Sequence, residues 1–232
     1  MKIIDAFWEQ RNLGVTCYEI SIGAKETVDE IKKAYHNIEE RQYMVVKIPS
    51  ENYNAVSFFQ EKDYVFIETA FTMIHHLRHF PLRPRLQVMC ERCSWEAMTE
   101  QDIEEMHHEI EKGIFKTDRV YCDPFFSTSQ AKRRYHLWLQ DQLNDGAIPY
   151  KVLYQGETVG FFCGSLAGAY SKFEGDGSGL FVQYSILASQ IRAGARKCEA
   201  HISGNNPAVL RIDQELGYTV KKMEYVLIKH KL

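Results

Sequence analysis

The chain has 232 residues, of which 45% are hydrophobic and 25% charged, and its formal net charge is −3. This length suits one large domain or two small ones, and the balance is that of a globular protein that buries a core. The composition argues against a nucleic-acid partner, which needs clustered Lys and Arg, and no apolar run is long enough for a membrane span.

The first part of the chain reads as alternating strands and helices. Apolar and polar residues alternate in the strand-like segments, while apolar residues recur on one face of the helical ones. The predicted elements are strands at 17–23, 43–48 and 64–74 and helices at 25–42 and 54–62. This order predicts an α/β lobe over residues 1–80.

Residues 79–86 contain two prolines and are interpreted as a crossing between two halves of the chain. Beyond it, Thr99 and Gly113 are predicted to cap the two ends of one helix. The predicted elements are strands at 86–93, within 149–166, at 169–173, 197–203 and 218–229, and helices at 99–113, 127–143, after Gly179 and at 207–216. These elements form a predicted second domain, residues 88–232.

Two stretches of the chain resemble each other. SENYNAVSFFQEKDY (50–64) and GNNPAVLRIDQELGY (204–218) superimpose without gaps, which matches Asn52 with Asn206 and Tyr64 with Tyr218. Both predict a strand, a turn, a short helix and a strand. One explanation is that short αβ units look alike by chance. The other is that the first half is a worn copy of the second.

The segment EGDGSG at residues 174–179 raises the question of anion binding. Its glycines precede a helical run, and a helix N-terminus offers unpaired N–H groups with a partial positive charge. Glu174 and Asp176 are unusual beside a phosphate, but several charge-assisted N–H bonds outweigh carboxylates that point outward. A Gly-rich surface turn before a helix is the alternative.

The pattern from residue 174 onward resembles the GNAT superfamily of N-acetyltransferases. The acetyl-CoA loop of that family reads Gln/Arg-x-x-Gly-x-Gly/Ala, and a later element reads roughly Asn-x-x-Ala-x-x-Leu-Tyr-x-x-Leu-Gly-Phe, matched here by NNPAVLRIDQELGY (205–218). The resemblance implies a GNAT-like α/β fold with a mixed sheet, preceded by a smaller lobe that resembles a partial repeat. It also implies acetyl-CoA as co-substrate, bound through Gly175, Gly177, Ser178, Gly179, Leu180 and Asn206.

The catalytic candidates follow from the same resemblance. In many relatives a Tyr in the helix after the Asn protonates the departing CoA thiolate, and that position is Asp213 here. An aspartate with an ordinary pKa of about 4 is ionised at neutral pH and would instead orient or deprotonate the amine. Tyr218 and Tyr184 are the substitute donors, and a core position is the other interpretation of Tyr218.

Other parts of the chain resemble dTDP-fucosamine-type sugar amine acetyltransferases. The matching stretches are WEQRNLGV (8–15), residues 47–73 and residues 115–143. The resemblance implies a substrate cleft, in which an arginine suits a phosphate or carboxylate and an aspartate or tyrosine suits an ammonium or hydroxyl group. The predicted cleft residues are Arg119, Tyr121, Asp123 and Tyr135. A turn at Asp123 and a core position for Tyr135 are the structural alternatives.

These features predict an N-acetyltransferase that moves an acetyl group from acetyl-CoA to a primary amine of a small molecule, with an amino sugar as one acceptor. The alternative is a catalytically degenerate GNAT-fold protein that binds a ligand or partner, which the acidic loop, the short strand before it and Asp213 favour. The expected partners are a small-molecule amine and, as an option, a second copy of the chain. Neither nucleic acid nor a membrane is expected.

Cysteines and histidines give no metal signal. Cys90 and Cys93 lack a second pair at zinc spacing, and His75, His76 and His79 lack a nearby carboxylate, so we expect no metal. Six cysteines in a chain that starts without a signal-peptide pattern fit reduced thiols, which predicts a cytoplasmic protein.

Overall fold

A computed structural model describes residues 1–170 and 178–231. The strands in it are β1 (Lys2–Asp5), β2 (Cys17–Ser21), β3 (Tyr43–Pro49), β4 (Val65–His75), β5 (Cys93–Ala97), β6 (Tyr150–Tyr154), β7 (Glu157–Cys163), β8 (Leu166–Ala169), β9 (Cys198–Ser203) and β10 (Thr219–His230). The helices are α1 (Trp8–Leu13), α2 (Val28–Tyr35), α3 (Tyr53–Gln60), α4 (Pro84–Glu91), α5 (Glu100–Lys112), α6 (Arg119–Cys122), α7 (Thr128–Asn144), α8 (Ser178–Arg192) and α9 (Pro207–Leu216). The predicted α/β class is confirmed.

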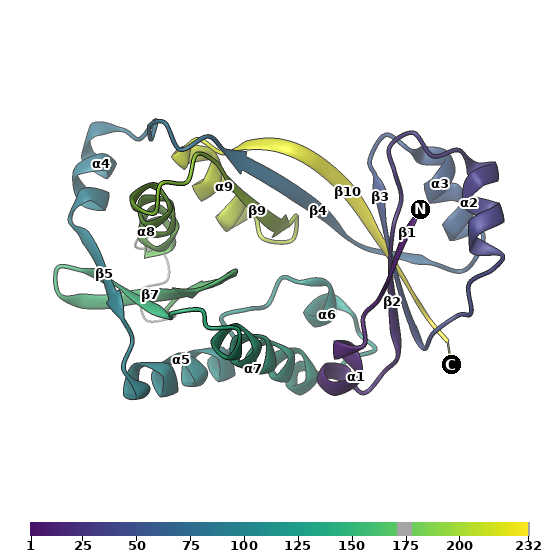
Figure 1. Cartoon of the computed structure of the whole chain (residues 1–232), viewed down its shortest axis with the longest axis horizontal. Helices are drawn as coiled ribbons and strands as arrows, with labels where there is room; N and C mark the ends of the chain where they lie inside the picture. The colour runs from purple at the N-terminus through teal and green to yellow at the C-terminus, as the bar shows by residue number, and fades with distance from the viewer. Residues whose placement is uncertain (171–177, 232) are drawn as a thin grey trace.

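The strands form two separate sheets. One has six strands in the order β1-β2-β3-β10-β4-β9, and the other has four in the order β5-β6-β7-β8. The larger sheet is mixed, since β2 and β3 are parallel while β10 is antiparallel to both of its neighbours. Figure 1 shows the long strands β4 and β10 along one side of the molecule and α5, α7 and α1 along the other.

The two αβ units of the internal repeat exchange their last strands. The first unit is β3-α3-β4 and the second is β9-α9-β10. β10 lies between β3 and β4, and β4 lies between β10 and β9, so each unit sends its final strand to the other. The predicted ranges 1–80 and 88–232 therefore share one sheet, and a domain division at that point stays a prediction.

Both faces of the six-stranded sheet are covered around β3. Met44 and Val46 face a core with Phe59 of α3, whereas Tyr43 and Val45 face a core that α6 and α7 help to close. A strand buried on both faces reads as a continuous apolar run, which explains the sequence YMVVKI.

One predicted strand was wrong in type. Residues 86–93 lie mostly in helix α4, which begins with Pro84 at its first turn, and the strand β5 starts only at Cys93. Leu86, Met89 and Cys90 have the spacing of a helix face, because residues three and four apart share a side. Of the strand predicted at 169–173, Ala169 is the last residue of β8, and residues 171–173 lie outside the described part of the chain.

Candidate active site

The two strands that flank α8 lie in different sheets. β8 is an edge strand of the four-stranded sheet, and β9 is an edge strand of the six-stranded one. An edge strand has one row of backbone N–H and C=O groups that no neighbouring strand uses. Among residues 1–170 and 178–231, β8 and β9 therefore each have one unpaired edge, and α8 lies between these two strands in the sequence.

Helix α8 begins at the segment predicted to bind acetyl-CoA. Glu174, Gly175, Asp176 and Gly177 lie outside the described residues, whereas Ser178, Gly179 and Leu180 form the first turn of α8. The first N–H groups of a helix have no partner within it. A Cβ added at Gly179 would lie 2.9 Å from Ile212 Cδ1, so this glycine also allows α8 to pack against α9.

Asn206 has a structural role at the start of α9. Its side-chain Oδ1 accepts a hydrogen bond from the backbone N–H of Val209 over 3.2 Å, which is an N-cap. The preceding Asn205 donates from Nδ2 to Cys122 Sγ over 3.6 Å, so the β9–α9 turn contacts α6. The side-chain amide of Asn206 keeps its donor group for other contacts.

Asp213 is completely buried in α9, and among the described residues neither carboxylate oxygen has a hydrogen-bond partner. Burial disfavours the charged form and raises the pKa of Asp213 to about 7. An ordinary aspartate would be ionised at neutral pH, but this one is present in both protonation states. A carboxyl group with a pKa near neutrality can act as a general acid.

Tyr218 occupies a core position. Its side chain is 4% exposed, its ring lies 5.3 Å from that of His75, and its hydroxyl donates to Cys198 Sγ over 3.4 Å. Burial raises its pKa above the ordinary value. The structure therefore places Tyr218 in the core, as the alternative interpretation expects, whereas the pKa of Asp213 is about 7.

Two of the predicted substrate residues are held by neighbouring charges. Arg119 is buried and donates from Nη2 to Glu19 over 2.5 Å, and this cation lowers the pKa of Glu19 to about 2. Asp123 is also buried, and its Oδ2 lies 2.8 Å from His230 Nε2. Both side chains are therefore already paired with other residues inside the protein.

The two predicted tyrosines differ in exposure. Tyr135 is buried and stacks on Phe115 with ring centroids 4.2 Å apart, as the core alternative expects. Tyr121 is half-buried in α6, where its backbone N–H is capped by Asp118. The predicted cleft residues thus lie in one region around α6 and α7. Most of their side chains are buried there.

Glu68 is a buried carboxyl group that the sequence did not single out. It lies on β4, its Oε2 has no hydrogen-bond partner among the described residues, and burial raises its pKa despite a hydrogen bond with Ser203. Ser203 is the last residue of β9, immediately before the turn that contacts α6. Glu68 therefore places a second carboxyl group of raised pKa near the end of β9.

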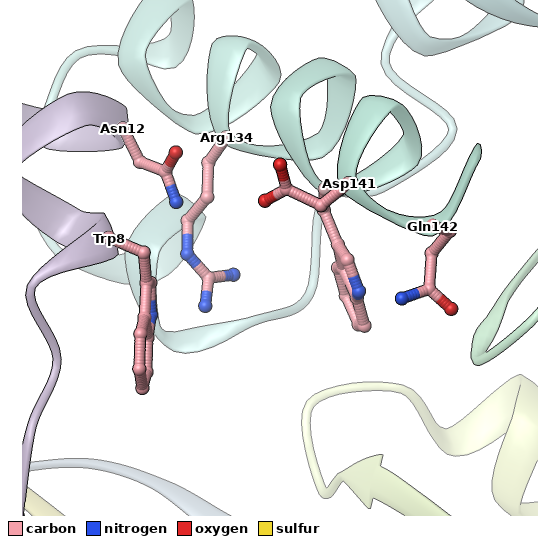
Figure 2. A pocket seen from close by; sticks show the side chains of 6 residues that line it. Trp8, Asn12, Arg134, Asp141 and Gln142 are labelled. Carbon is pink, nitrogen blue, oxygen red and sulfur yellow. The ribbon is translucent and has the colours of Figure 1, made fainter. Parts of the chain in front are cut away.

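A hollow of about 270 Å³ lies between α1 and α7. Figure 2 shows the Arg134 guanidinium group with Trp8 on one side and Asp141 and Gln142 on the other. The lining residues are Trp8, Asn12, Arg134, Trp138, Asp141 and Gln142. None of them was predicted as a site residue, although all lie in the stretches 8–15 and 115–143 that carry the resemblance to sugar amine acetyltransferases.

No protein family and no curated protein matches the chain by sequence. Solved structures do match. A GCN5-related N-acetyltransferase from Sphaerobacter thermophilus superimposes with a TM-score of 0.55 and 16% identity over 87% of this chain and 64% of that one. A tandem GNAT protein from the clavulanic acid biosynthesis pathway superimposes with a TM-score of 0.53 and 11% identity over 92% of this chain and 75% of that one. A fungal GCN5-related glucosamine N-acetyltransferase region, within a multi-domain β-N-acetylglucosaminidase, superimposes with a TM-score of 0.54 and 10% identity. The match covers 87% of this chain and 27% of that one.

These likenesses establish the GNAT fold, as the sequence resemblance implied. The chain spans 64% of the length of the Sphaerobacter protein. Within residues 1–170 and 178–231, no group of three or more His, Cys, Asp and Glu residues is placed to hold a metal ion. In the same residues, no helix combines the length and apolar character of a membrane span.

Proposed function

We propose that the chain is an N-acetyltransferase that transfers an acetyl group from acetyl-CoA to a primary amine of a small molecule. The observation that carries the proposal is the separation of β8 and β9 within a GNAT fold. In the family that the sequence resembles, the strand before the glycine loop lies along the cofactor and donates a main-chain N–H to the thioester carbonyl. The unpaired edge of β8 has donors of this kind.

The first half of the repeat lacks this opening. Its corresponding strands are β2 and β3, which pair in parallel from Cys17 opposite Tyr43 to Ser21 opposite Lys47. The backbone groups that would face a cofactor are used there by the sheet. We therefore place acetyl-CoA in the second half alone.

The buried carboxyl groups support the chemistry. The amine nitrogen attacks the thioester carbonyl, the C–S bond breaks, and the proton lost by the amine balances the proton gained by the CoA thiolate. Asp213 has a pKa of about 7 and stands where relatives have the proton-donating Tyr, so its protonated form is the proposed donor. Glu68, whose pKa is also raised, is the proposed acceptor.

Thermal unfolding with acetyl-CoA tests the cofactor, because a ligand that binds only the folded state raises its melting temperature. A shift that grows with acetyl-CoA concentration is expected, and no shift at millimolar acetyl-CoA would contradict the proposal. A panel of primary amines, followed by release of free CoA thiol, then tests transfer. A thermal shift without thiol release from any amine would favour the degenerate binding protein instead.

A further inference from the structure

The hollow between α1 and α7 combines two aromatic walls with a small volume. Trp8 and Trp138 line it, and its volume is about 270 Å³. Sites for drug-sized ligands usually measure roughly 300–1,000 Å³, so this one suits a ligand of about one ring. An indole face packs on apolar C–H surface while its N–H stays a donor.

The free polar groups of the hollow are donors. Arg134 uses Nε for Glu9 at 3.1 Å and Nη1 for Asp118 at 3.3 Å, and among the described residues Nη2 has no partner. The Gln142 Oε1 accepts from the backbone N–H of Ser165 over 3.1 Å, which leaves Nε2 to donate. Since an indole N–H can only donate, a matching ligand presents several oxygen acceptors.

The acceptors that line the hollow are already paired. Both oxygens of Asp141 accept from Arg11, at 2.9 and 2.5 Å. Asn12 donates to Glu9 over 3.3 Å and accepts from Arg11 Nε over 3.4 Å. A cationic amine would therefore find no unpaired carboxylate among the lining residues.

A continuous set of contacts links the hollow to the β9–α9 turn. Arg134 contacts Asp118, the N-cap of α6, and Cys122 at the other end of α6 accepts from Asn205. Asn205 follows β9, one of the two unpaired strand edges of the proposed cofactor opening. The hollow and the β9–α9 turn are thus both in contact with α6.

We infer that this hollow is the acceptor site and that it binds a single hexosamine ring through its hydroxyl oxygens, with the amine turned away from the hollow. The term acceptor site rests on the proposed function, whereas binding of the ring does not. The C–H face of the sugar packs on an indole. Arg134 Nη2, Gln142 Nε2 and the indole N–H groups donate to the hydroxyl oxygens.

Tryptophan fluorescence tests binding without acetyl-CoA. The chain has three tryptophans, and the third, Trp95, lies on β5 against Arg192 rather than in the hollow. In a Trp95→Phe background, both remaining indoles line the site. We expect glucosamine and N-acetylglucosamine to change their emission with a saturating curve and putrescine, an amine without hydroxyl groups, to leave it unchanged.

Gln142→Glu is the sharpest variant, because it keeps the oxygen that Ser165 needs but removes the free amide donor. We expect about tenfold weaker glucosamine binding, the effect of one lost hydrogen bond. Gln140→Glu is the matched control, since Gln140 is exposed on the same helix and donates to Asn144 over 3.1 Å. Trp8→Phe, which keeps a ring but loses the indole N–H, provides an independent second variant.

The outcomes separate the two proposals. Saturable sugar binding that Gln142→Glu weakens, with no acetyl transfer to any amine, supports the site and contradicts the enzyme. Acetyl transfer to glucosamine that proceeds equally in Gln142→Glu and Trp8→Phe supports the enzyme and overturns the site. Emission that changes linearly with sugar, or equally with putrescine, also overturns the site.

Discussion

Asn52 and Asn206 cap their helices in the same way: each side-chain Oδ1 accepts the N–H of the N3 residue over 3.2 Å. Their backbone angles also agree, with φ and ψ of −94° and 66° at Asn52 and −112° and 70° at Asn206. Each asparagine follows a strand and precedes a helix and a long strand. This agreement favours the copied-half explanation of the internal repeat over chance similarity.

Gly217→Ala is expected to destabilise the protein more than Gly194→Ala. Both glycines have a positive φ, +100° and +79°, so alanine is strained at either position. At Gly217 the new Cβ would also lie 2.8 Å from Pro81 Cδ, whereas nothing lies within 4 Å at Gly194. Urea unfolding should show a loss of about 1 kcal/mol for Gly194→Ala and about 2–4 kcal/mol for Gly217→Ala. Equal losses would show that the contact with Pro81 has no cost.

Asp213 should make stability depend on pH. Its pKa is about 7 in the folded protein and lower in the unfolded chain, so the folded state keeps a proton that the unfolded state releases. The stabilising contribution is complete below about pH 4 and falls as pH rises to about 7. Between about pH 5 and pH 8, the melting temperature should therefore fall more steeply in the natural protein than in Asp213→Asn. Parallel curves would contradict this, and Glu215→Gln, an exposed change on the same helix, is the control.

Glu68→Gln should slow the proposed acetyl transfer by about 10²–10⁴-fold, the usual range for a lost general base. The amide cannot take the proton of the attacking amine, while it fills the same space. Glu224→Gln is the matched control, because Glu224 lies on the adjacent strand β10 and is paired with Lys222 at 2.7 Å. Comparison of kcat/KM for the two variants measures the effect. A similar loss of kcat/KM in both variants would mean that the change disturbs the sheet, rather than that Glu68 takes part in the reaction.

The pair of His107 and His136 should destabilise the protein at low pH. Their Nδ1 atoms lie 2.7 Å apart, and burial, followed by the neighbouring imidazole, lowers the pKa of His107 below 6.5. The unfolded state thus binds a proton that the folded state resists, so stability is lost as pH falls below about 6.5. In His107→Gln the melting temperature should respond less to acid between about pH 7 and pH 5. His108→Gln, an exposed neighbour, should retain the natural response.

Cleavage between the halves should not separate them. Arg78 is exposed immediately before the crossing segment 79–86, whereas the peptide bond after Arg83 precedes Pro84 and resists trypsin. Limited trypsin treatment should therefore cut after Arg78. The two fragments should elute together from a sizing column and part only in denaturant, because β10 lies between β3 and β4. Separate elution of native fragments would support two independent domains at 1–80 and 88–232.

Local features of this fold were predictable and distant ones were not. Thr99 and Gly113 cap α5 as expected, since caps depend on a few adjacent residues. The exchange of β4 and β10 joins residues from opposite ends of the chain, and no local pattern encodes that pairing. Residues 86–93 were assigned wrongly because a short apolar run fits a strand or a helix until its neighbours are known.

The candidate site likewise has features that the sequence could predict and features that it could not. Counting along the helix identified Asp213, but its raised pKa comes from burial, which depends on the packed structure. Arg119 and Asp123 carry the right chemistry for a substrate, yet their partners Glu19 and His230 come from distant strands. No single sequence shows which of its charges are paired internally, so the free donors of the hollow were missed.

The strand exchange also sets the order in which the protein can be completed during synthesis. β10 comes long after β3 and β4 in the sequence, but it lies between them in the larger sheet. Until β10 has been synthesised, β3 and β4 each lack the strand that pairs with both of them. Their hydrogen-bonding edges are then exposed to other chains. The nascent protein therefore cannot finish its first half and then add the second. Both halves of the sheet close at once, when β10 emerges.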